Sequence, residues 1–128
     1  MPIRVLIVDD TDSLRELLRS LCEEAGMDVV GEAADGGAAV ALAAQQLPDA
    51  VILDVEMPIM DGLDALPRLK TAAPDAHVAV FSSRNDPETE VTARQRGADG
   101  YFVKGEVSSR EVVAAVLAGT RDERGMSG

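Results

Sequence analysis

Apolar runs of strand length alternate with segments of helical periodicity along nearly the whole chain. The runs are rich in β-branched and aliphatic residues and predict strands over residues 3–8, 28–33, 50–54, 77–82 and 100–104. Apolar residues at helical spacing predict helices over residues 14–25, 36–46, 62–73, 86–96 and 108–118. This strict alternation predicts one α/β domain, built as a doubly wound, five-stranded parallel sheet with five helices on its two faces.

Two of the predicted helices carry features that weaken them. Pro67 lies inside helix 62–73, where it should remove one hydrogen bond and kink or shorten the helix, at a cost of about 3 kcal/mol. Helix 86–96 has little apolar surface besides Val91 and Ala93. A helix anchored by so few side chains is predicted to be among the more mobile elements.

Composition limits the kind of partner this domain can have. Its 128 residues contain 12 Lys and Arg against 23 Asp and Glu, a net charge of -11. This balance argues against nucleic-acid binding, which usually needs a basic patch, and favours a cationic metal or a basic protein surface. No signal-peptide pattern and no apolar run near membrane-spanning length occurs, which predicts a cytoplasmic protein without membrane contact. We expect the domain to cover residues 1–120 and a flexible tail to cover 121–128.

Several single residues have ordinary structural interpretations. Cys22 falls in an apolar helical stripe and is expected to be a buried thiol, compatible with a reducing compartment. Asp12 and Asp61 are expected to cap helices. His77 begins a strand, away from the strand ends, and is expected to be solvated or to cap an element.

Five chemically capable side chains stand where four of the predicted strands end: Asp9, Asp10, Asp54, Ser82 and Lys104. The carboxyl ends of parallel strands meet at one edge of a sheet, where open α/β sheets hold their ligands. Three carboxylates gathered there would repel one another, each pair at 4 Å by about 4 kcal/mol at an effective dielectric constant of 20. The sequence therefore predicts a bound cation, and Mg²⁺ suits a site of oxygen ligands.

A metal, a lysine and a hydroxyl donor beside a carboxylate describe phosphoryl transfer onto Asp54. An aspartate with an ordinary pKa is ionised at neutral pH, needs no general base, and is a known acceptor that forms aspartyl-phosphates. Lys104 and the metal would stabilise charge on the transferring phosphoryl group. Ser82 would donate a hydrogen bond to the same group.

Four motifs surround these residues: VDD at 8–10, LDVEMPIMDG at 53–62, Ser82, and GADGYFVK at 97–104. Together they resemble the receiver domain of two-component response regulators, of the CheY-like superfamily, over residues 3–118. The resemblance implies a flavodoxin-like (βα)5 fold with strand order 2-1-3-4-5. It also implies a signalling phosphoacceptor that catalyses only its own phosphotransfer and dephosphorylation.

The same resemblance implies a phosphodonor and a set of metal ligands. Asp54 would receive its phosphoryl group from the phosphohistidine of a sensor histidine kinase or a histidine phosphotransfer protein. Asp10, Asp54 and the backbone carbonyl of Glu56 would bind Mg²⁺ directly, and Asp9 would act mainly through water.

A switch is implied as well. Ser82 and Tyr101 match the family's switch pair, in which the hydroxyl moves toward the phosphoryl group and the aromatic ring swings inward. The response would appear on the face made by the fourth helix, fifth strand and fifth helix. A downstream protein, or a second copy in a phosphorylation-dependent homodimer, would bind there.

Pro67 and several positions near the predicted site depart from the commonest family pattern. Gly105 stands where a proline usually follows the lysine, so no cis peptide is expected there. Glu56 and Ser83 resemble the receivers of chemotaxis methylesterases. Glu56 and Arg84 also stand where the family varies the residues that set phosphoryl lifetime, and an ion pair between them across the pocket mouth could hinder the attacking water.

Other protein classes share parts of this pattern. An aspartyl-nucleophile phosphatase of the dehalogenase type uses Mg²⁺ and an acyl-phosphate, but it needs an Asp-x-Asp pair where this chain has Glu56, and usually a cap domain. A flavodoxin-like electron carrier needs a hydroxyl-rich phosphate loop where this chain has Asp9 and Asp10. A third alternative is the receiver fragment of a larger methylesterase or DNA-binding regulator.

Overall fold

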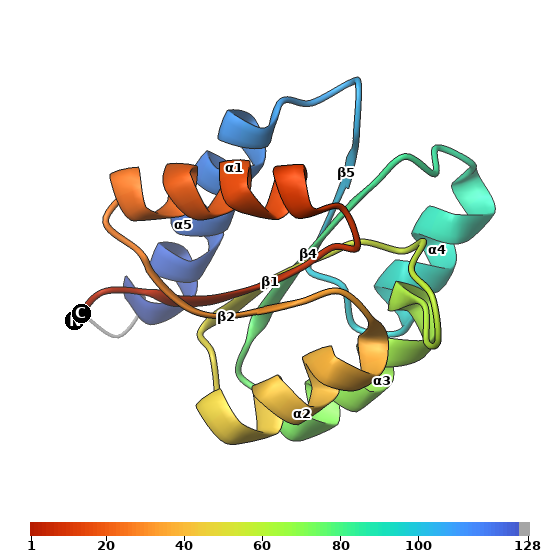
Figure 1. The fold of residues 1–128 in the computed structure, drawn as a ribbon, viewed down its shortest axis with the longest axis horizontal. Helices are drawn as coiled ribbons and strands as arrows, with labels where there is room; N and C mark the ends of the chain where they lie inside the picture. Colours follow the sequence, from red (N-terminus) through yellow and green to blue (C-terminus); the bar gives the residue numbers. More distant parts are fainter. Residues whose placement is uncertain (126–128) are drawn as a thin grey trace.

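A twisted sheet of five parallel strands forms the centre of the computed structural model, which describes residues 1–125 and the side chains of residues 1–121. The strands are β1 (Arg4–Val8), β2 (Asp28–Ala33), β3 (Ala50–Leu53), β4 (His77–Ser82) and β5 (Gly100–Val103). They pair in the order β2-β1-β3-β4-β5 (Figure 1), which confirms the predicted fold and strand order. Reversal of the strand order between β1 and β3 creates the switch point at which such sheets hold ligands.

Helices cover both faces of this sheet. They are α1 (Asp12–Glu24), α2 (Gly36–Gln46), α3 (Gly62–Ala72), α4 (Pro87–Gln95) and α5 (Ser109–Gly125). Helices α1 and α5 lie on one face, and α2, α3 and α4 lie on the other (Figure 1). Helix α5 continues to Gly125, past the predicted domain boundary at 120, and residues 126–128 of the predicted flexible tail lie outside the described residues.

The alternation of side chains along each strand divides the core in two. In β1, Leu6 and Val8 pack toward α2 and α3, whereas Val5 and Ile7 pack toward α1 and α5. Successive side chains of a strand point to opposite faces, so a strand covered on both faces must be apolar throughout. Cys22 is fully buried in the second of these layers, as predicted, and burial raises the pKa of its thiol to about 12.

Of the two predicted capping residues, Asp61 caps a helix and Asp12 does not. The side chains of Asp61 and Asp86 accept hydrogen bonds from the backbone N–H groups of Asp64 and Thr89, as N-caps do. Asp12, in contrast, is the first residue of α1 and not its cap. The cap position belongs to Thr11, and the Asp12 carboxylate pairs with Arg15, so the predicted role of Asp12 is wrong.

Pro67 does not end α3, which runs on to Ala72. A proline inside a helix leaves the carbonyl four residues earlier without its usual N–H partner. Here that carbonyl belongs to Leu63, and it accepts a hydrogen bond of 2.8 Å from Arg96 Nη1, just beyond the end of α4. The predicted shortening of α3 is therefore wrong, because the Arg96 side chain, just after α4, satisfies the freed carbonyl.

Helix α4 is held to the rest of the domain by few side chains. Thr89 and Ala93 are its buried residues, whereas the Val91 side chain is 53 % exposed and adds no anchor. None of the helices among the described residues has the length and apolar character needed to cross a membrane.

Candidate phosphoryl-transfer site

The carboxyl ends of β1 and β3 bring three carboxylates together. Asp9, Asp10 and Asp54 each offer an oxygen atom within 4.8 Å of the others, a spacing at which one cation can bind to all three. Asp9 and Asp54 are buried and Asp10 is exposed. The sequence predicted this cluster from the position of each acid at a strand end. In the structure, Asp54 N donates to the Val8 carbonyl, which sets the ends of the two strands side by side.

Lys104, directly after β5, bridges two of these acids. Its Nζ atom lies 2.8 Å from Asp9 Oδ2 and 3.5 Å from Asp54 Oδ2. Asp9 is held further by the backbone N–H of Thr11, which donates to Asp9 Oδ1 at 2.9 Å. One lysine faces three carboxylates, so the pocket keeps excess negative charge and fits a hard divalent cation.

The environment of Asp54 opposes its ionisation. Burial raises the pKa of its carboxyl from the ordinary 3.8 to about 6, and the charges of Asp9 and Asp10 act in the same direction, while Lys104 opposes them. A second positive charge beside Asp54 would lower this pKa again and favour the ionised form further.

The chain around Asp54 turns back on itself to form a tight loop. Gly62 N donates to the Val55 carbonyl at 2.7 Å, and a Cβ atom at residue 62 would lie 2.1 Å from the Asp54 carbonyl oxygen. Only glycine fits there. Ile59, at the tip of the loop, is 91 % exposed and has a φ of +70°, a conformation that is strained for a β-branched residue.

Ser82 and Tyr101 converge on the backbone of one residue, Arg84, in the loop between β4 and α4. Ser82 Oγ accepts a hydrogen bond of 3.2 Å from Arg84 N, and Tyr101 Oη donates one of 2.7 Å to the Arg84 carbonyl. Ser82 is fully buried at the end of β4. The predicted switch pair is therefore joined through the backbone of Arg84.

The predicted ion pair between Glu56 and Arg84 is wrong. Arg84 Nε instead contacts Asp86 Oδ1 at 3.1 Å, and Glu56 Oε1 accepts a hydrogen bond of 3.4 Å from Ser83 Oγ. The Arg84 side chain turns toward the start of α4, where the Asp86 carboxylate has a pKa lowered to about 2, chiefly by its hydrogen bond from the Thr89 hydroxyl.

Gly105 follows Lys104 with a φ of +93°. Proline cannot adopt this conformation, because its ring fixes φ near −65°. The departure from the family's proline therefore has a local cause: the chain after Lys104 turns through a left-handed residue before Val107 pairs with Lys104.

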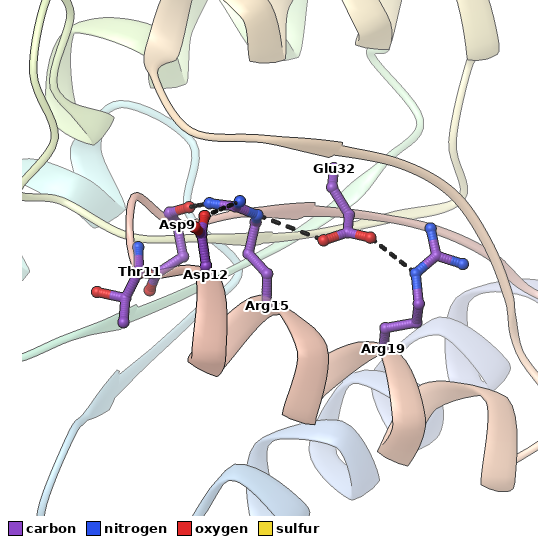
Figure 2. Close-up of polar contacts among 6 residues, drawn as sticks. All are labelled: Asp9, Thr11, Asp12, Arg15, Arg19 and Glu32. Atoms are coloured by element: carbon purple, nitrogen blue, oxygen red, sulfur yellow. Dashed lines mark hydrogen bonds and ion pairs between the residues drawn. The ribbon is translucent and has the colours of Figure 1, made fainter.

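Sequence reasoning missed two residues beside the pocket, Arg15 and Glu32. Arg15 Nη1 donates to the Asp9 backbone carbonyl at 2.6 Å, and its Nε contacts Glu32 Oε1 at 3.3 Å (Figure 2). No motif marks this pair. The contact depends on how α1 lies over β2, which the pattern of either segment alone does not specify.

Comparisons with known proteins agree with this geometry. A family model described as the response regulator receiver domain matches residues 5–117. The nitrate/nitrite response regulator NarL of Escherichia coli is 40 % identical over 104 residues, covering 80 % of this chain and 48 % of NarL. A protein-glutamate methylesterase/protein-glutamine glutaminase of Caulobacter vibrioides is 41 % identical over 104 residues, covering 80 % of this chain and 30 % of that protein.

Solved structures show the same fold. A complex of CheX with CheY, BeF3 and Mg²⁺ from Borrelia burgdorferi contains a chain that matches with a TM-score of 0.85 and 28 % identity, covering 92 % of this chain and 89 % of that one.

This chain spans about half the length, or less, of the two curated relatives, NarL and the methylesterase. Their nearly equal identities do not favour the predicted methylesterase resemblance over a NarL-like one.

Proposed function

Because this chain belongs to the family of response regulator receiver domains, we propose that Asp54 is its phosphoacceptor and that phosphorylation switches the binding of a partner protein. One observation carries this proposal. The Lys104 ammonium lies within ion-pair distance of Asp54 in a pocket that also gathers Asp9 and Asp10. An acceptor carboxylate, a cation and a set of metal ligands are thus in one place, as phosphoryl transfer requires.

Mg²⁺ is the cofactor that this donor set suits. Asp10, Asp54 and the Glu56 backbone carbonyl would hold it directly, and Asp9, already bound by Lys104 and Thr11, would act through water. When bound, the ion supplies positive charge that neutralises the acids and the oxygens of the incoming phosphoryl group. Mg²⁺ in the related Borrelia burgdorferi complex supports this assignment.

The chain's own side chains complete the site. Asp54 attacks as an ionised carboxylate, so no proton has to leave it. Lys104 is a flexible point charge that can exchange its carboxylate contacts for a phosphoryl oxygen. The Ser82 hydroxyl, at the end of the neighbouring strand, donates a hydrogen bond to another of these oxygens.

The output surface is the one formed by α4, β5 and α5. Ser82 binds the Arg84 N–H and Tyr101 binds the Arg84 carbonyl, so a change at Ser82 is transmitted to the loop that leads into α4. Helix α4 has only two buried residues and can respond at low energetic cost. Phosphorylation shifts this equilibrium only as far as the phosphoryl group is held better in one conformer than in the other.

We further propose a phosphodonor, a domain boundary, an output and two residues that tune phosphoryl lifetime. The donor is a sensor histidine kinase or a histidine phosphotransfer protein in the cytoplasm, and the chain catalyses only its own phosphotransfer and dephosphorylation. The receiver unit is assigned to residues 1–120, and its last helix, α5, extends past this boundary to Gly125. Its output is a protein partner, a second copy of the chain, or a methylesterase or DNA-binding domain of a longer protein. Glu56 and Arg84, at the pocket mouth, tune phosphoryl lifetime separately and not as an ion pair.

The proposal is tested by intact-mass spectrometry after incubation with acetyl phosphate and Mg²⁺. We expect one phosphoryl group per chain in the wild type and none in Asp54→Asn. Asp61→Asn is the matched control, because Asp61 lies in the same loop and caps α3, and it should be labelled like the wild type. Unchanged labelling of Asp54→Asn would refute the site. Steady release of phosphate from small phosphoesters would instead indicate a phosphatase.

A further inference from the structure

The side chain of Arg15 is the centre of a polar cluster that includes Asp9 of the acid pocket (Figure 2). It projects from α1, is 16 % exposed, and uses all three of its guanidinium nitrogens. Nη1 donates to the Asp9 carbonyl at 2.6 Å, Nη2 pairs with Asp12, and Nε contacts Glu32 at 3.3 Å. The other Glu32 oxygen accepts a hydrogen bond of 2.7 Å from Arg19. Arg15 is therefore fixed in place by carboxylates on two sides.

The peptide unit between Asp9 and Asp10 is held through its carbonyl, which accepts the hydrogen bond from Arg15. The preceding peptide unit is held separately, because the Asp9 N–H donates to the Ala33 carbonyl at 3.0 Å. The Asp10 carboxylate, by contrast, is exposed and has no hydrogen bond or ion pair to other described residues. Because the Asp10 side chain is itself unrestrained, its direction depends on the peptide plane that precedes it.

We infer that Arg15 is a positioning residue for the metal site: it holds the Asp9–Asp10 peptide so that the Asp10 carboxylate faces the pocket before the cation arrives. This inference rests on the proposed function, in which Asp10 binds Mg²⁺. Groups that orient metal ligands without touching the metal typically contribute ten- to a hundredfold to affinity. Arg15 acts here through the main chain. Glu32, which is itself held by Arg19, keeps the Arg15 guanidinium group aligned.

The sign of the effect separates positioning from simple electrostatics. Removing a positive charge near a divalent cation should strengthen cation binding, because like charges repel. Loss of a positioning contact should weaken it. Arg15 and Arg19 share the same Glu32 partner, but Arg19 has no contact with the Asp9 peptide, so the two arginines form a matched pair.

The experiment is isothermal titration calorimetry of Mg²⁺ into the unphosphorylated protein. We expect Arg15→Met to weaken Mg²⁺ affinity about tenfold. Arg19→Met should bind Mg²⁺ as well as the wild type or more tightly, and Arg15→Lys, which keeps one donor, should be intermediate. Thermal unfolding of each variant checks that it is folded.

A double-mutant cycle assigns the effect to Asp10. Arg15→Met should cause no further loss in an Asp10→Asn background, because the ligand that Arg15 orients is already removed. Equal affinity of Arg15→Met and Arg19→Met, or an additive loss in the double variant, would overturn the inference. If Mg²⁺ binding by the wild type does not depend on Asp10 at all, the proposed metal site fails instead, so the two failures are distinguishable.

Discussion

Asp54 is the residue at which function and stability oppose each other. Its carboxyl has a pKa of about 6 in the folded chain against 3.8 ordinarily, because the site is buried and acidic. Well below pH 3.8 the carboxyl is protonated in both the folded and the unfolded state and changes nothing. As pH rises from 3.8 to 6, the unfolded chain loses this proton while the folded chain largely keeps it, so the free energy of unfolding falls. Ionised Asp54 therefore destabilises the fold at neutral pH.

This sign predicts that Asp54→Asn is more stable than the wild type at neutral pH. In the absence of divalent cations we expect a gain in the free energy of unfolding of about 1–2 kcal/mol near pH 7.5, and a much smaller gain near pH 4.5. Urea denaturation at both pH values measures it. Asp61→Asn should show no such pH-dependent gain. A gain for Asp54→Asn that is the same at both pH values would contradict the argument.

Individual side chains differ in how far the sequence predicts them. The ends of parallel strands converge whatever the details of packing, so the meeting of Asp9, Asp54 and Lys104 followed from chain order alone. The ion-pair partner of Arg84 could not be predicted in this way, because the chain offers two carboxylates, those of Glu56 and Asp86, and packing decides between them. The contacts of Arg15 depend on the fit of α1 against β2, which no local pattern encodes.

At the scale of elements, α3 and α4 are joined by a contact that a proline makes necessary. Pro67 leaves the Leu63 carbonyl without a helical partner, and Arg96 Nη1 supplies one at 2.8 Å. The sequence predicted a disrupted α3, because it shows the proline but not the distant side chain that satisfies the freed carbonyl. This contact holds the C-terminal end of α4, so movement of α4 should be concentrated at its N-terminal end.

A double-mutant cycle tests that contact. Arg96→Met should cost about 0.5–1.5 kcal/mol of stability in the wild type. In a Pro67→Ala background the cost should be smaller, since alanine at this position supplies a backbone N–H to the same carbonyl. Urea denaturation measures both. Arg94→Met is the control, because Arg94 pairs with Glu90 on its own helix and should be additive with Pro67→Ala. Additivity of Arg96→Met with Pro67→Ala would contradict the coupling.

For the whole molecule, the question is how a charge added at one edge of the sheet reaches a binding surface. Ser82 and Tyr101 lie on adjacent strands, and both bind backbone atoms of Arg84, in the segment that leads into α4. The remaining core, apolar on both faces of the sheet, is too closely packed to deform continuously. We therefore expect a local rearrangement of the segment from Arg84 to the first turns of α4, with α2 unchanged.

Hydrogen exchange measured by mass spectrometry, with and without acetyl phosphate and Mg²⁺, tests this path. Phosphorylation of the wild type should change exchange in residues 83–95 and 100–103 and leave residues 36–46 unaltered. Tyr101→Phe removes only the hydroxyl that binds the Arg84 carbonyl, so it should take up phosphoryl normally but show a smaller change in residues 83–95. Asp54→Asn with the same donor should show none. An undiminished change in fully labelled Tyr101→Phe would mean that the hydroxyl does not couple Asp54 to α4, and that the signal passes through Ser82 alone.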